Sequence, residues 1–173
     1  MRHMTAVLLA ATCAAGFGLP AMAGDAAKLP QNGKVKFQVS YVQWTGRDIQ
    51  LDGKTSFGTF EFAGITRNVE GKPWFDRMTE HCTGQYYAGE KRSAATNGSC
   101  LYVDPDGDKV MINWTGGTVP YAGTKQVVGG TGKYAGITGQ GTYTGTDLKT
   151  PAEGMDLWLT DVELDFQIKA PTQ

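Results

Sequence analysis

Histidines, cysteines and grouped acidic residues carry much of enzyme chemistry, and this chain has few of them in useful arrangements. His81, the one histidine beyond the first residues, precedes Cys82 in a stretch that alternates with threonines, which is typical of a solvent-facing strand. No G-x-S-x-G motif supplies a serine nucleophile. Asp161, Glu163 and Asp165 alternate with an apolar row, so we expect them to face water rather than form an acid–base pair. No catalytic residue is assigned, and whether the protein is an enzyme stays open.

Aromatic residues on alternating segments are the best candidates for a binding site. Packing in a core accounts for many side chains of this kind. The alternative is the wall of a cavity that binds an apolar or aromatic molecule, with an occasional hydroxyl or indole N–H to orient it. The candidate cavity residues are Tyr41, Trp44, Tyr86, Trp114, Tyr143 and Trp158.

The stretch Asp104–Asp108 has the sequence Asp-Pro-Asp-Gly-Asp and separates two alternating segments. Proline presets φ and Asp-Gly accepts positive φ, so the stretch predicts a hairpin turn. Asp104, Asp106 and Asp108 also resemble a fragment of a calcium loop, but calcium takes 6–8 oxygen ligands and the remaining ligands are missing. We therefore expect no metal site, with a weak cation site at these three aspartates as the alternative.

The first 23 residues have the three parts of a secretory signal peptide. Arg2 gives a positive start, Ala6–Ala15 forms an apolar run, and Ala21-Met22-Ala23 offers the small residues that signal peptidase recognises. The apolar run is shorter than the roughly 20 residues that a membrane span needs. We expect a secreted or periplasmic protein without a membrane span. A signal peptide, a tail and one domain would occupy residues 1–23, 24–33 and 34–173.

Cys82 and Cys100 are the two cysteines that remain once Cys13 leaves with the leader. An even pair in an exported protein is typical of a disulfide, because oxidising compartments keep such bonds closed. Metal binding and a reactive thiol are the alternatives, but a spacing of 18 residues with one nearby histidine matches no zinc motif. The pair therefore predicts a Cys82–Cys100 disulfide, and no cofactor is expected.

Alternating apolar and polar residues run through the chain after residue 30, without helical periodicity, in segments separated by Gly, Asn, Asp and Pro. Three long segments change phase by one residue: near Val42, at Gly58, and between Leu159 and Val162. Such shifts are typical of β-bulges, which bend sheets. The pattern predicts an all-β fold, a single closed eight-stranded antiparallel barrel, with a β-sandwich as the alternative. The expected strands are Lys34–Thr45, Thr55–Ile65, Arg77–Tyr87, Ser99–Val103, Lys109–Thr115, Lys125–Val128, Gly139–Leu148 and Met155–Ile168.

The most specific motif is glycine-rich and follows Val128: Gly129-Gly130-Thr131-Gly132-Lys133-Tyr134. It has neither a Walker Lys-Ser/Thr ending nor a surrounding βαβ pattern, which argues against a nucleotide site. It is similar to the conserved segment of allene oxide cyclases and dirigent proteins, where a strand runs into Gly-Gly-[Thr/Ser]-Gly, one further residue and an aromatic. The chain thus resembles an exported bacterial branch of that barrel superfamily. Gly129, Gly130 and Gly132 would allow a tight turn, and Tyr134 would plug the barrel end.

The resemblance implies an eight-stranded antiparallel barrel, often as a homo-oligomer, and two kinds of function. Allene oxide cyclases guide the closure of a fatty-acid epoxide, and dirigent proteins orient phenoxy radicals for coupling. Their acidic and arginine motifs have no counterpart here, so no catalytic residue carries over. The first hypothesis is a non-catalytic exported barrel that binds a small hydrophobic or aromatic molecule or a partner. The second is a barrel that steers cyclisation or coupling, which an inward-facing charged pair would favour.

The overall charge narrows the choice of partners. Sixteen Lys and Arg against 17 Asp and Glu give a formal net charge of −1, without a basic stripe. A nucleic-acid-binding protein would show a basic excess, so this class is excluded. A small apolar ligand and further copies of the chain are the expected partners.

We predict that the exported protein begins at Gly24, because the Ala-x-Ala ending and the apolar run place the cleavage there. N-terminal sequencing of the secreted or periplasmic form checks this. An intact Met1 in that form would contradict it.

Overall fold

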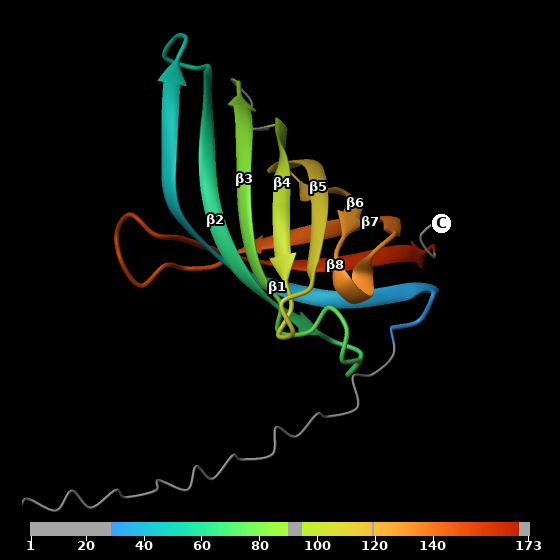
Figure 1. Ribbon diagram of the computed structural model, residues 1–173. Helices are drawn as coiled ribbons and strands as arrows, with labels where there is room; N and C mark the ends of the chain where they lie inside the picture. The colour runs from blue at the N-terminus through green and yellow to red at the C-terminus, as the bar shows by residue number, and fades with distance from the viewer. Residues whose placement is uncertain (1–28, 90–94, 119, 170–173) are drawn as a thin grey trace, which may run out of the picture.

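The computed structural model describes residues 29–89, 95–118 and 120–169, apart from the side chains of Trp44, Thr45 and Ala95. The predicted signal peptide and Cys13 lie outside these residues. Eight strands follow one another, each antiparallel to the next, and the last pairs with the first to close a barrel (Figure 1). The single closed eight-stranded barrel is therefore confirmed over the β-sandwich. The strands are β1 (Asn32–Gln50), β2 (Ser56–Asn68), β3 (Thr79–Ala88), β4 (Ala95–Val103), β5 (Lys109–Thr118), β6 (Tyr121–Gly130), β7 (Ile137–Asp147) and β8 (Asp156–Ile168).

The core of the barrel comes from the alternation that the sequence displays. Val35 and Phe37 of β1 face inward opposite Leu164 and Val162 of β8, and all four are buried. The residues between them point outward, where Lys36 pairs with Glu163 at 2.5 Å. Because successive side chains of a strand point to opposite faces, one apolar row fills the interior and one polar row faces water. In the described part of the chain, no helix is long and apolar enough to span a membrane.

Two of the three expected phase shifts are wrong, and the third is displaced. β2 and β8 keep one phase throughout, because Phe57 and Leu159 belong to the outward-facing set of their strands although they are apolar. Apolar side chains on the outer face therefore produced, in the sequence, the same pattern that a β-bulge would produce. In β1 the register shifts between Gln43 and Thr45 rather than at Val42. A further shift, which the pattern did not reveal, lies at Met111/Ile112 between β5 and β6.

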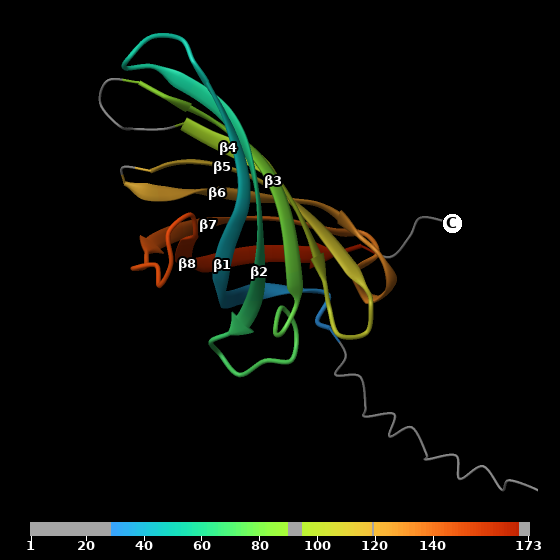
Figure 2. The same ribbon diagram turned by 90° about the vertical axis from the view of Figure 1, so that its left-hand side faces the viewer.

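The shift in β1 gives the barrel two different ends. Residues up to Gln43 pair with β8, whereas Thr45–Gln50 pair with β2 alone. Beyond that point the β1–β2 hairpin, followed by β3 and β4, stands away from β8 (Figures 1 and 2). We call this the open end of the barrel. Its hairpins connect β1 to β2, β3 to β4, β5 to β6 and β7 to β8.

The opposite, closed end is plugged by the connection between β2 and β3 together with the glycine motif. Phe75 and Met78 of this connection are fully buried, and the Phe75 ring stacks on Phe37 with 5.3 Å between centroids. Tyr134 packs edge-on against Phe75 at 5.7 Å, which is the plugging role expected for it. Gly132 has a φ of 55°, and a Cβ there would overlap the Asp108 carboxylate, so the motif requires glycine at this position.

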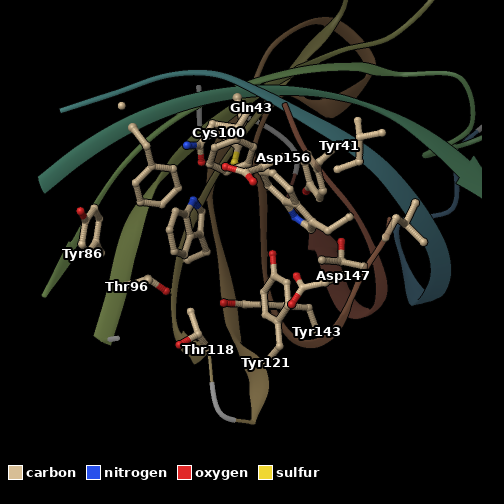
Figure 3. Close-up of a pocket in the computed structure, with 18 of the residues that line it drawn as sticks. Tyr41, Gln43, Tyr86, Thr96, Cys100, Thr118, Tyr121, Tyr143, Asp147 and Asp156 are labelled. Carbon is tan, nitrogen blue, oxygen red and sulfur yellow. The ribbon is translucent and has the colours of Figure 1, made fainter. Parts of the chain in front are cut away.

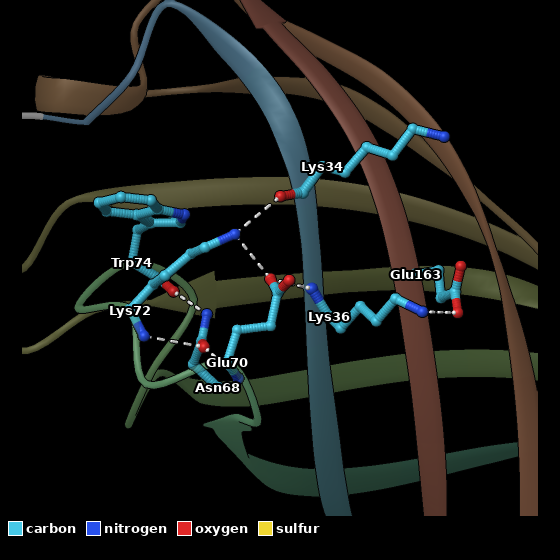
Figure 4. A network of polar contacts seen from close by, with 7 residues as sticks. All are labelled: Lys34, Lys36, Asn68, Glu70, Lys72, Trp74 and Glu163. Atoms are coloured by element: carbon cyan, nitrogen blue, oxygen red, sulfur yellow. Dashed lines mark hydrogen bonds and ion pairs between the residues drawn. The ribbon is translucent and has the colours of Figure 1, made fainter.

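Polar contacts fasten the plug to β1 on its outer side (Figure 4). Asn68 Oδ1 accepts hydrogen bonds from the backbone N–H groups of Glu70 and Lys72, at 2.9 and 3.0 Å. The Asn68 amide donates to the Trp74 carbonyl at 2.9 Å, and the backbone N–H of Lys36 donates to Glu70 at 3.1 Å. This network fixes the conformation of the β2–β3 connection, which places the Phe75 side chain inside the barrel.

Cys82 and Cys100 lie directly opposite each other on β3 and β4 and form the disulfide that was predicted from the sequence. Both sulfurs face inward and are buried. The bond closes a loop that includes the β3–β4 hairpin, so it restricts the unfolded chain across part of the open end.

We predict that replacing both cysteines by alanine lowers the free energy of unfolding by about 2–4 kcal/mol, since the closed loop of about 19 residues loses its entropic constraint. Denaturant unfolding of Cys82→Ala/Cys100→Ala measures this. Leu101→Ala is the control, because Leu101 lies on the same strand but faces outward. A double variant as stable as the parent would contradict the prediction.

Candidate functional site

A cavity of about 540 Å³ lies inside the open end, and all eight strands contribute side chains to it. Tyr86 and Thr96 lie on one side, Tyr143 and Asp147 lie on the other, and Tyr41 and Cys100 lie farther in (Figure 3). Five of the six aromatic residues singled out from the sequence line it: Tyr41, Tyr86, Trp114, Tyr143 and Trp158. The sixth, Trp44, has its side chain outside the described part of the chain.

The inner wall of the cavity is aromatic and tightly packed. Tyr41 stacks on Trp158 with 5.2 Å between ring centroids, and Phe62 meets Tyr41 edge-on at 5.1 Å. Phe60 and Phe62 lie 6.0 and 6.1 Å from Trp114. Such rings offer flat apolar surfaces at several orientations, which suits a ligand that itself contains an aromatic ring.

Pairs of inward-facing glycines make room for these rings. Gly84 and Gly98 lie opposite each other on β3 and β4, and a Cβ on either would come within 2.8 Å of the Trp114 ring. Gly116 and Gly123 form a second pair beneath Tyr143, where a Cβ on Gly123 would lie 2.6 Å from that ring. The indole and the phenol therefore lie against bare backbone, where a side chain would occupy their place.

The indole N–H of Trp114 is a hydrogen-bond donor without an acceptor in the described part of the chain. It is buried and has no hydrogen-bond partner among the described residues. A buried N–H without a partner costs free energy, so such groups in native proteins are commonly satisfied by a bound water or ligand. Trp114 thus combines a ring on the cavity wall with a buried N–H whose hydrogen-bonding capacity is unmet.

A buried polar cluster, which we call the floor, lies at the deep end of the cavity. Tyr41 donates from its hydroxyl to the Glu80 carboxylate, 2.9 Å from each oxygen. Lys125 donates from Nζ to the Tyr102 hydroxyl at 3.0 Å. The Cys82 sulfur, which carries no proton in the disulfide, lies 3.0 Å from Glu80 Oε1. Tyr41 and Lys125 line the cavity itself, so the floor is within reach of a bound molecule.

Burial shifts the ionisation of every titratable group in the floor. It raises the pKa of Glu80 while the Lys125 charge acts to lower it. It lowers the pKa of Lys125 while the Glu80 charge acts to raise it. Burial, followed by the Glu80 charge, raises the pKa values of Tyr41 and Tyr102 well above the ordinary value. An acid and a base whose pKa values move toward each other can exchange a proton at low cost.

Glu80 and Lys125 were not identified as site residues from the sequence, although the spacing between Glu80 and Cys82 could have indicated the first of them. Glu80 lies two residues before Cys82, so once the disulfide faces inward, Glu80 must share that face. Lys125 shares a face with Val127, but the register shift at Val128 hides which valine of the Val127-Val128 pair points inward. Tyr102, which the pattern did not place, is buried between them.

The other residues singled out from the sequence lie away from the cavity. His81 is on the outer face, 3.3 Å from Glu61. The acids Asp161, Glu163 and Asp165 are exposed, as expected. Glu80, Cys82 and Cys100 bring three ligand-type groups within 4.8 Å of one another, but the disulfide removes the thiolates that a metal would need.

The Asp104–Asp108 stretch forms the predicted turn, with Gly107 at a φ of 89°. Asp104 Oδ1 accepts from the backbone N–H groups of Asp106 and Asp108, at 2.9 and 3.0 Å. Lys133 places its ammonium against the carboxylates of Asp104 and Asp106, the latter at 2.5 Å. The Lys133 ammonium of the glycine motif therefore lies against two of the three aspartates of the alternative cation site.

The fold is a closed eight-stranded barrel of the dirigent and allene oxide cyclase type. A solved structure of this type is the pterocarpan synthase dirigent protein GePTS1, which matches with a TM-score of 0.52 over 84% of this chain and 91% of that chain, at 11% identity. At that identity the likeness shows the fold alone. No family model matches the sequence, and no curated protein matches it.

We predict that Glu80→Gln destabilises the fold by about 3 kcal/mol at pH 7, because it leaves the Lys125 charge buried without a counter-charge. Lys125 has its pKa lowered on folding, so this penalty is largest at low pH and fades as pH rises toward the unfolded value of about 10.4. Chemical denaturation of variant and parent between pH 6 and 10 measures the difference.

Glu80→Gln/Lys125→Met should recover part of the loss, since no uncompensated charge remains. Glu163→Gln, in an exposed ion pair, is the control and should change little. A Glu80→Gln loss that is equal at pH 7 and pH 10 would exclude the electrostatic cause.

Proposed function

We propose that this barrel binds one small aromatic molecule in the cavity, with its ring between the aromatic walls and a polar group directed at the floor. The observation that carries the proposal is the buried, unpartnered N–H of Trp114 on the wall of a 540 Å³ cavity. Cavities of about 300–1,000 Å³ with mostly apolar walls and a few convergent polar groups are typical of small-molecule sites.

Export forms part of the same proposal. The signal-peptide pattern of residues 1–23 and the buried Cys82–Cys100 disulfide support a secreted or periplasmic protein, since such bonds persist in oxidising compartments. The mature chain would then consist of a tail over residues 24–33 and the barrel domain over 34–173. Its ligand would be met outside the cytoplasm.

The second candidate function is the steering of a cyclisation or coupling reaction. Glu80 and Lys125 provide the inward-facing charged pair that favours this hypothesis, and they lie behind the aromatic wall with two tyrosine hydroxyls. The structural neighbour is a pterocarpan synthase, so a barrel of this type can host a synthase. A non-catalytic binder would return its ligand unchanged, whereas a steering protein would return a different product.

An outer apolar row supports self-association, the other partner expected from the resemblance. Ile49, Phe57 and Tyr87 lie directly opposite one another on β1, β2 and β3, and each is about half exposed. A second copy of the chain would shield this row from water.

We predict saturable binding of one apolar environment-sensitive dye, N-phenyl-1-naphthylamine, with quenching of indole fluorescence. Trp114→Ala should weaken binding by at least about 1 kcal/mol, or fivefold in Kd, because one aromatic contact is lost. Tyr87→Ala, which removes an exposed aromatic from the outer face, is the control and should bind as the parent does.

Native mass spectrometry of protein purified from its own host should in addition retain a small ligand, and it reports the oligomer mass. Absence of saturable dye binding would contradict the binding function and leave a protein partner as the leading account.

A further inference from the structure

We propose that Lys125 captures a carbonyl group of the bound molecule as a Schiff base, so that the cavity selects aromatic aldehydes or ketones. The proposal rests on the binding function above and names the chemical class of the ligand. Lys125 is the one buried lysine among those that the structure describes, and its side chain lines the cavity.

The register of the barrel places Lys125 beside the donor that a carbonyl needs. On β6 it lies directly opposite Trp114 of β5, whose indole N–H is unpartnered, and opposite Gly141 of β7 on its other side. Directly opposed residues on one face have Cβ atoms about 5 Å apart. A carbonyl oxygen that reached the Trp114 N–H would lie on the same part of the wall as Lys125, whose Nζ lies 5.6 Å from the centre of the Tyr143 ring of β7.

The surroundings of the amine favour its reactive form. An exposed lysine has a pKa of about 10.4 and is almost fully protonated at pH 7, whereas addition to a carbonyl requires the neutral amine. Burial lowers the pKa of Lys125, although the Glu80 charge partly opposes this. Burial that lowers the pKa of a lysine is a known way to make the amine nucleophilic.

The floor supplies the proton transfers. Nζ of neutral Lys125 adds to the carbonyl carbon, a C–N bond forms, and the C=O π electrons move to the oxygen, which takes the first of the two amine protons and becomes a hydroxyl. Nitrogen then releases a proton through the Tyr102 hydroxyl, with which it is hydrogen-bonded at 3.0 Å, toward Glu80. Glu80, whose pKa is raised by burial, returns that proton as the hydroxyl leaves as water. The sum is amine plus carbonyl giving imine plus water, with no change of oxidation state.

Lys133 shows why other lysines should not react in this way. Hydrogen bonds to Asp104 and Asp106 raise its pKa despite partial burial, which keeps it protonated. It is therefore the matched control within the same chain.

The test uses the mature protein with 2-naphthaldehyde, followed by reduction with sodium cyanoborohydride and peptide mapping by mass spectrometry. We expect one saturable adduct on Lys125, at least about tenfold more abundant than on Lys133 or any other lysine. An excess of 2-naphthalenemethanol, which has the same ring but no carbonyl, should block labelling by occupying the cavity. Adducts spread evenly over the lysines, or labelling that the alcohol does not block, would overturn the proposal.

Lys125→Arg keeps the positive charge but cannot form the imine, so it should lose the adduct, and binding of the alcohol is measured on the parent by indole quenching. Alcohol binding to the parent without any Lys125 adduct would overturn carbonyl capture and leave the binding function intact. Failure of the parent to bind the alcohol and the aldehyde alike would instead overturn the binding function itself. The competition arm needs no variant, so a misfolded Lys125→Arg leaves the test decisive.

Discussion

Pairing between β1 and β8 closes the barrel, and the residue at which this pairing stops determines the shape of everything else. Up to Gln43 the two strands pair residue by residue; buried side chains fill the interior from Val35 to Val39, and the cavity begins at Tyr41. Beyond the register shift, β1 follows β2 alone and the wall opens. The molecule therefore has a packed half that stabilises it and a hollow half, which includes the bulge, that can bind.

Glycines, which have no side chains, keep the open half of the barrel from filling. A sheet lined with Trp, Tyr and Phe would ordinarily collapse on itself, because aromatic rings gain from mutual burial. Here the Gly84–Gly98 and Gly116–Gly123 pairs lack the side chains that would collide with the Trp114 and Tyr143 rings, so these rings lie close against the backbone. The cost is lost packing in the unliganded protein, and the disulfide on β3 and β4 offsets part of that cost at the same end.

Glu80 and Lys125 fit a site better than they fit a purely structural role. Apolar residues of similar size would in general stabilise an interior at least as well as a buried pair of charges. The four-membered polar floor instead places an acid, an amine and two hydroxyls where water is excluded and where the aromatic cavity ends. Proton transfer and capture of a polar ligand group are the uses to which such an arrangement is suited.

The features that the sequence predicted correctly are those set by residues close together in the chain. Alternation along β1 and β8 predicted the apolar interior, Asp-Pro-Asp-Gly predicted the turn at Asp104–Asp108, and the position of the aromatics predicted five residues of the cavity wall. These properties depend on neighbours in sequence or on a period of two. The bulge at Gln43/Thr45 and the meeting of Glu80 with Lys125 were decided only by closure of the barrel. Both features depend on which strands lie side by side in the closed barrel. The alternation alone also cannot distinguish an outward apolar residue such as Phe57 from an inward one.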